Sequence, residues 1–216
     1  ESLMETGLPT NIIRFKGSAL ARWVLALFGW RVLFAGVPGN KGVIAVYPHT
    51  SNWDFPLGIF AKWTLGIPIR FWGKDSLFKV PIFGHWMRYV GGVPVDRTAK
   101  NGLITSTVSQ MLATPDDGLF WLALAPEGTR KKIPGWRSGF YRVACEAGVP
   151  LCIAYFDYPR KIVGVDYFFM PTGDEAQDMA RIAGALQGRI GCKPENMSPI
   201  RLLDASVARD KSLIVS

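Results

Sequence analysis

Four short apolar runs recur along the chain, and each is typical of a buried β-strand. They are rich in β-branched and aromatic residues, and proline closes the first two. Continuous apolar runs of this length, rather than alternating ones, are typical of strands that are covered on both faces. The predicted strands are residues 42–47, 118–125, 150–156 and 163–170.

Between and after these runs lie segments whose apolar residues recur at helical spacing. Gly148 follows one of them, in the position where glycine commonly ends a helix. Strands that alternate with helices predict an α/β fold with a central, mostly parallel sheet flanked by helices. The predicted helices are residues 99–113, 139–147 and 174–190.

Residues 12–34 intersperse arginine and lysine among large apolar side chains. The segment predicts a helix, weakened near Gly29 and ended before Pro38. At a membrane interface its basic side chains would reach phosphate headgroups, and Trp23 and Trp30 would lie at the boundary. The alternative is a core helix whose basic side chains extend into solvent.

The chain therefore divides into an N-terminal lead-in with a membrane-interface helix, residues 1–38, and a single α/β domain, residues 39–216. No segment reaches the roughly 18 uninterrupted apolar residues that predict a transmembrane helix. The nearest, residues 23–38, carries Arg31. Three cysteines without C-x-x-C spacing favour a reducing setting over a disulfide framework. The expected location is peripheral, on the cytoplasmic face of a membrane.

Composition narrows the class of partner. Hydrophobic residues make up 49% of the chain and charged residues 19%, against the roughly 25% charged residues usual in soluble domains. The formal net charge of +8 suits anionic lipid, nucleic acid or an acidic carrier protein. The apolar excess favours lipid. A nucleic-acid binder is not expected, because the basic residues cluster after strands and along an apolar helix instead of lining a groove with stacking aromatics.

Two polar clusters follow predicted strands directly, at 49–54 and 127–130. Ligands of α/β sheets bind beyond the carboxyl ends of the strands. In a turn leading into a helix, His49 can fold back onto Asp54, whose carboxylate would fix the imidazole tautomer and leave the other nitrogen to accept a proton. The alternative is a histidine at a strand end beside an aspartate that merely begins a helix. His85, between aromatic residues and with no nearby acid, is interpreted as structural.

The second cluster and its surroundings are basic. Arg130 could bind a phosphate with its forked donors, and Glu127 could hydrogen-bond a substrate hydroxyl or orient a basic residue. Arg97 ends a short extended run that begins at Gly91. Together with the basic residues that follow Arg130, these positions indicate an anion pocket, although a Pro-Glu-Gly-Thr sequence is also ordinary turn chemistry.

These residues resemble the glycerolipid acyltransferases related to bacterial 1-acylglycerol-3-phosphate acyltransferase. The His-x4-Asp block at 49–54 comes first, and the extended run ending in arginine at 91–97 comes second. Pro-Glu-Gly-Thr-Arg at 126–130 is present letter for letter, and a Val-Pro with a hydrophobic strand follows at 149–153. Lys74, upstream of the second block, also fits.

The resemblance implies thioester-dependent acyl transfer onto a hydroxyl, with His49 as general base and Asp54 orienting it. The donor would be acyl-CoA or an acyl carrier protein, and no bound cofactor or metal is implied. The absence of Gly-x-Ser-x-Gly agrees with direct transfer. The residues that would bind substrate are Lys74, Arg97, Glu127, Gly128, Thr129 and Arg130.

Departures from the family pattern bear on the acceptor. Pro48 precedes the histidine where many members have asparagine, and Trp53 and Phe55 lie beside the catalytic pair. Lysophosphatidic acid is the default acceptor. Another lysolipid, such as a lyso-aminolipid, remains an alternative, as does a non-catalytic membrane lipid-binding module.

Overall fold

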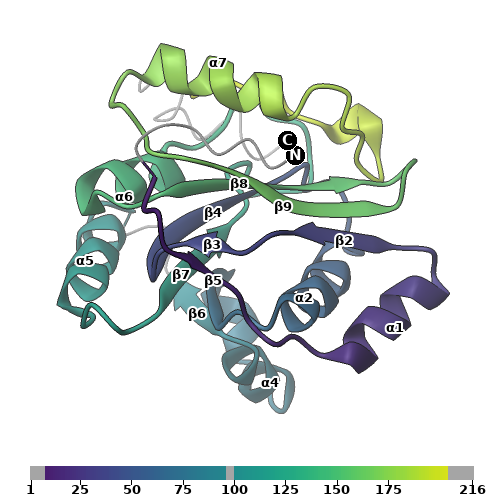
Figure 1. Cartoon of the computed structure of the whole chain (residues 1–216). Helices are drawn as coiled ribbons and strands as arrows, with labels where there is room; N and C mark the ends of the chain where they lie inside the picture. The colour runs from purple at the N-terminus through teal and green to yellow at the C-terminus, as the bar shows by residue number, and fades with distance from the viewer. Residues whose placement is uncertain (1–7, 96–99, 204–216) are drawn as a thin grey trace.

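The computed structural model describes residues 8–95 and 100–203, with the side chains of residues 100 and 101 left aside. Its centre is a seven-stranded sheet in the order β2-β9-β8-β4-β7-β5-β6 (Figure 1). The strands are β2 (Arg31–Phe34), β4 (Lys41–Tyr47), β5 (Ile69–Lys74), β6 (Gly92–Val95), β7 (Phe120–Leu124), β8 (Leu151–Asp157) and β9 (Ile162–Phe169).

The five adjacent strands from β8 to β6 are all parallel, and β9 runs antiparallel to β8. Strand β2 lies parallel to β9 at the edge. The predicted α/β fold with a mostly parallel sheet is confirmed. All four predicted strands are present, within a few residues of their expected ends.

Helices cover both faces of the sheet. Side chains of α5 (Lys100–Ala113), α6 (Gly139–Ala147) and α7 (Glu175–Ala185) pack on one face, with Trp136 and Phe140 fully buried. The other face is covered by α1 (Ala19–Leu27) and α2 (Asp54–Leu65). Two short helices, α3 (Asp75–Phe78) and α4 (Phe83–Tyr89), connect β5 to β6 beside α2 (Figure 1). A 3-10 turn, η1 (Pro194–Asn196), lies near the end of the described chain.

The N-terminal segment differs from its prediction. The helix predicted over 12–34 is only α1, and residues 31–34 form β2 instead. The helix ends at Leu27 with Phe28 as its C-cap, and Gly29 follows with φ 77°, a backbone conformation that turns the chain away from a helical path. A two-stranded sheet of β1 (Ile12–Ile13) and β3 (Val37–Pro38) flanks this segment. In the described part of the chain, every helix is too short or too polar to span a bilayer.

Glycine ends two helices as local chemistry requires. Gly148 closes α6 with φ 63°, as predicted, and Gly66 closes α2 with φ 75°. Asp174 caps α7 by accepting a hydrogen bond from the Gln177 N–H.

Because β4, β7, β5 and β8 are parallel, their carboxyl ends, and the loops that follow them, share one edge of the sheet.

Candidate active site

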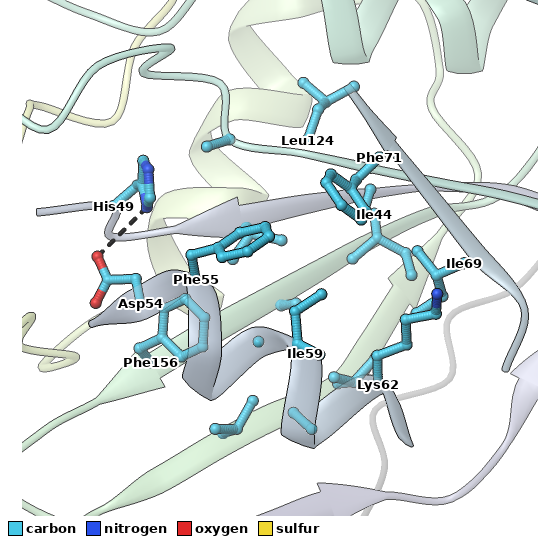
Figure 2. A pocket seen from close by; sticks show the side chains of 18 of the residues that line it. Ile44, His49, Asp54, Phe55, Ile59, Lys62, Ile69, Phe71, Leu124 and Phe156 are labelled. Carbon is cyan, nitrogen blue, oxygen red and sulfur yellow. Dashed lines mark ion pairs between the residues drawn. The ribbon is translucent and has the colours of Figure 1, made fainter. Parts of the chain in front are cut away.

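His49 and Asp54 lie together at the carboxyl end of β4. The chain leaves β4 through a cis peptide bond between Tyr47 and Pro48 and enters α2 at Asp54. The Nδ1 atom of His49 lies 3.3 Å from Oδ2 of Asp54 (Figure 2). The turn therefore brings together two side chains that a continuous helix would hold apart.

Asp54 is buried and surrounded by hydrogen-bond donors. Its Oδ2 accepts from the main-chain N–H groups of Thr50 and Ser51, each at 2.8 Å, and its Oδ1 accepts from the Tyr158 hydroxyl at 2.6 Å. Burial opposes ionisation, but the hydrogen bonds from His49, Tyr158 and Ser51 outweigh it and lower the pKa of Asp54. The carboxylate is thus ionised at neutral pH.

This arrangement assigns different roles to the two nitrogens of His49. Nδ1 faces the Asp54 carboxylate, which favours the tautomer with its proton on Nδ1. Nε2 then carries the lone pair and is the atom that can accept a proton. The His49 side chain is partly exposed, so a reacting group can approach it.

Glu127, in the loop that follows β7, holds the main chain at His49 in place. It is fully buried, and its Oε2 accepts from the His49 main-chain N–H at 2.6 Å while Oε1 accepts from the Ser198 N–H at 3.1 Å. Burial raises the pKa of Glu127, although these hydrogen bonds act in the opposite direction. Both oxygens are thus occupied by main-chain amides, and a direct contact of Glu127 with substrate stays a prediction.

The other predicted substrate-binding residues that the structure describes lie along the same edge. Gly128 has φ 64°, and a side chain there would meet the Arg137 guanidinium at 2.8 Å. Thr129 accepts a hydrogen bond from the Lys131 N–H at 3.3 Å, and Arg130 is exposed. Lys74, the last residue of β5, is also exposed. Arg97 lies outside the described residues.

Tyr158 and Ser198 were missed by the sequence analysis. Tyr158 directly follows β8, so the rule that ligands gather at strand carboxyl ends could have found it. Ser198 comes from a segment without regular structure, and its contact with Glu127 spans 71 positions of the sequence. No local pattern indicates such a contact.

An apolar cavity of about 200 Å³ extends from His49 and Asp54 between α2 and the sheet. Figure 2 shows His49 and Asp54 at one end and Lys62 and Ile69 at the other. The Nζ of Lys62 donates a hydrogen bond to the main-chain carbonyl of Val90. Side chains that line the middle include Ile44, Phe55, Ile59, Phe71 and Phe156.

A family model described as acyltransferase matches residues 31–156, more than half of the chain. The chain belongs to this acyltransferase family. The match contains His49, Asp54 and the Pro126–Arg130 block, and it ends just before Tyr158. Among the residues that the structure describes in this acyltransferase, no group of three or more His, Cys, Asp or Glu side chains is arranged to hold a metal ion.

The acyltransferase is similar to curated 1-acyl-sn-glycerol-3-phosphate acyltransferases. It is 31% identical over 145 residues to one from Chlamydomonas reinhardtii, covering 65% of this chain and 39% of that protein. It is 28% identical over 131 residues to the chloroplastic BAT2 of Brassica napus, covering 59% and 35%. The matches thus span about two fifths or less of those relatives.

Among solved structures, the acyltransferase resembles the 1-acyl-sn-glycerophosphate (LPA) acyltransferase PlsC from Thermotoga maritima. The TM-score is 0.52 at 19% identity, over 77% of this chain and 73% of that one. This likeness supports the same fold.

Proposed function

We propose that this acyltransferase moves a fatty acyl group from a thioester donor onto the free hydroxyl of a lysophospholipid, with lysophosphatidic acid as the default acceptor. The observation that carries the proposal is the His49–Asp54 pair at the mouth of an apolar cavity. A buried carboxylate that holds an imidazole is the arrangement a general base requires. The adjacent cavity offers an apolar surface for an acyl chain.

In the proposed reaction, His49 Nε2 takes the proton from the acceptor hydroxyl as its oxygen attacks the thioester carbonyl. The C–O bond forms, the C–S bond breaks through a tetrahedral intermediate, and the imidazolium returns the proton to the leaving thiolate. Asp54 holds Nδ1 and stabilises the imidazolium while it exists. General bases of this kind contribute about 10²–10⁴-fold in rate.

The donor is acyl-CoA or an acyl carrier protein. The predicted acceptor site comprises two exposed cations near the carboxyl ends of the strands, Lys74 and Arg130. Arg97 is also predicted to belong to this site and lies outside the described residues. Arginine suits a phosphate because its planar donors can bind two oxygens at once. Gly128 and Thr129 shape the turn that positions Arg130, and Glu127 fixes the main chain at His49.

Peripheral association with the cytoplasmic face of a membrane is part of this proposal. Helix α1 buries Ala21 and Leu25, whereas Trp23, Leu27 and Phe28 are exposed. An apolar face of this kind, flanked by basic residues, is typical of helices that lie in a membrane interface.

The test is a mass-spectrometric screen of lysolipid acceptors against acyl-CoA and acyl carrier protein donors. The control is His49→Ala, which keeps the main-chain N–H that Glu127 accepts from. The proposal expects a new diacyl product with the native protein and none with His49→Ala. A native protein that binds lysolipid yet acylates none of the acceptors would identify a lipid-binding module instead.

A further inference from the structure

Helix α4 leaves large apolar side chains exposed. Gly84 and Met87 are buried, and a side chain at Gly84 would come within 2.2 Å of the Phe78 carbonyl oxygen. This close approach fixes which side of the helix faces inward. Trp86 and Tyr89, three residues apart on another side, are exposed, and Tyr89 is 85% exposed. A helix on a water-facing surface would carry polar residues there.

The turn before α4 extends this apolar surface. Ile82 has φ 62° and ψ −58°, and the Phe83 N–H donates to the Pro81 carbonyl at 2.6 Å, which closes a γ-turn. A β-branched residue at positive φ is a strained outlier. Its side chain is 86% exposed, so no packing in the described structure offsets the strain. Such strain commonly marks a functional position.

Most of the exposed large apolar side chains belong to two segments of the chain. Of the large hydrophobic residues that are exposed in the described structure, all but Leu112 and Ile190 precede residue 94. They belong mainly to α1 and to the α3–α4 segment, which lie on either side of α2 (Figure 1). Concentrated patches mark interaction sites, whereas scattered single residues do not.

The chemistry of the α3–α4 segment suits a lipid surface. Lys74, Lys79 and Arg88 are exposed along it, and Asp75 is the one acidic residue between positions 74 and 93. Tryptophan, tyrosine and phenylalanine beside lysine and arginine are typical of side chains at the boundary between headgroups and acyl chains. Snorkelling basic side chains can then reach anionic headgroups.

The same segment is linked to the proposed acyl cavity. The Trp86 ring lies 6.0 Å from the Phe55 ring, centre to centre, and Phe55 lines the cavity beside Asp54. A lipid that enters from this side would thus meet the cavity mouth. This places α4 beside the route that a membrane substrate needs.

We propose that residues Val80, Ile82, Phe83, Trp86 and Tyr89, named the α4 surface, form a second membrane contact that inserts into an anionic lipid surface beside the active site. It complements α1 on the other side of α2 (Figure 1). The proposal deepens the membrane association of the proposed function and rests on it in that respect.

The test compares vesicle binding of full-length variants by sedimentation. The probes are vesicles of equal parts phosphatidylcholine and phosphatidylglycerol, with phosphatidylcholine vesicles alone in a second arm. The double variant Ile82→Asn/Tyr89→Ser removes two exposed apolar side chains. Neither of them packs against an aromatic ring in the described structure. Leu112→Asn on α5, also an exposed apolar position, is the matched control. A pair of substitutions in α1, Leu20→Asn/Leu27→Asn, forms the comparison arm.

We expect the double variant to bind mixed vesicles about tenfold more weakly or worse, because each large apolar side chain contributes more than that when fully buried. Leu112→Asn binds like the native protein. The melting temperature of the double variant stays close to the native value, because both substituted side chains are almost fully exposed. Reduced binding then has no explanation in unfolding.

Native-like vesicle binding by the double variant overturns the proposal, most clearly where the α1 pair alone abolishes binding. The native protein could instead self-associate without lipid, and the double variant could lose that self-association while it still binds vesicles. This result would assign the α4 surface to a protein contact and would also overturn the proposal. Acyl transfer in detergent micelles separates this question from the proposed function. In micelles we expect the double variant to keep native turnover. If the native protein transfers no acyl group in micelles, the proposed function is wrong, but the proposed membrane contact is not affected.

Discussion

The Tyr158 hydroxyl donates a 2.6 Å hydrogen bond to Oδ1 of Asp54, across 104 positions of the sequence. Tyr158 directly follows β8, and its ring packs edge-on against Trp30 at 4.9 Å, in the segment between α1 and β2. The Asp54 carboxylate is therefore held by its own turn and by the residue that follows β8, which in turn packs on Trp30 of the N-terminal segment. Tyr158 is a positioning residue in this account, because it acts on His49 through Asp54.

Replacing Tyr158 with phenylalanine should alter the pH dependence of the reaction. The hydroxyl is one of the groups that lower the pKa of Asp54, so its loss raises that pKa towards the ordinary value. When the pH is lowered, Asp54 of the variant therefore becomes protonated at a higher pH than Asp54 of the native protein. We expect kcat to fall about threefold to tenfold and the acidic limb of the kcat/KM profile to move to higher pH. An unchanged profile with a lower melting temperature would indicate a structural role only.

Replacing Glu127 with alanine should destabilise the fold. The buried N–H groups of His49 and Ser198 lose their acceptor, at about 1–3 kcal/mol for each unsatisfied group. Glu146→Ala is the control, because Glu146 forms an exposed ion pair with Arg142. The measurement is urea unfolding of both variants. If Glu127 acts solely by contacting substrate, the unfolding midpoint stays native while the KM for the acceptor rises.

Arg130→Ala should weaken the binding of phosphate-bearing acceptors specifically. Arg130 is exposed, so the free energy of unfolding should change by less than about 0.5 kcal/mol. The KM for lysophosphatidic acid should rise about tenfold, since a charge-assisted hydrogen bond contributes about 1.5–3 kcal/mol. Arg142→Ala, on α6, should change neither quantity. Equal effects on acceptors with and without a phosphate would remove Arg130 from the acceptor site.

Lys62 should limit the length of the acyl chain. Its side chain lies at the far end of the cavity from His49, and its ammonium group bonds the Val90 carbonyl (Figure 2). Burial lowers the pKa of Lys62, so the folded state gains stability as the pH rises from that lowered pKa towards the ordinary value. Lys62→Met removes the charge at similar length.

The readout for Lys62→Met is the profile of turnover against donor chain length. We expect the preferred chain to become longer and the rise in stability at alkaline pH to disappear. Lys79→Met, at an exposed position outside the cavity, is the matched control. An unchanged chain-length profile would show that the cavity end does not set specificity.

The parts of the fold that sequence predicts well are those with local signals. Apolar runs closed by Pro48 and Pro126 mark β4 and β7, and Gly148 marks the end of α6. The sequence of β2 was predicted as helix because large apolar residues recur beyond α1 despite Gly29 and Arg31. Its strand conformation depends on pairing with β9, which lies more than a hundred positions away. Long-range pairing overrides local propensity there.

The candidate site divides in the same way. The approach of His49 to Asp54 could be predicted because a short turn at a strand end determines it. The end of β8 points to Tyr158 as a candidate, but its contact with Asp54 could not be predicted, and neither could the contact of Ser198 with Glu127, because each joins distant segments. Tertiary folding brings those groups together, and no local pattern in the sequence indicates the contacts.

The kinetics of Asp54→Asn test the central claim most directly. Asparagine keeps one oxygen to accept from the turn amides but can no longer hold the Nδ1–H of His49 as a carboxylate does. With purified protein, we expect kcat to fall on the order of 10³–10⁴-fold, as for loss of the orienting acid in a comparable triad, while the Kd for the acceptor stays within about twofold of native. A native kcat, or a loss of acceptor affinity as large as the loss of rate, would contradict the assignment of His49 and Asp54 as the catalytic base pair.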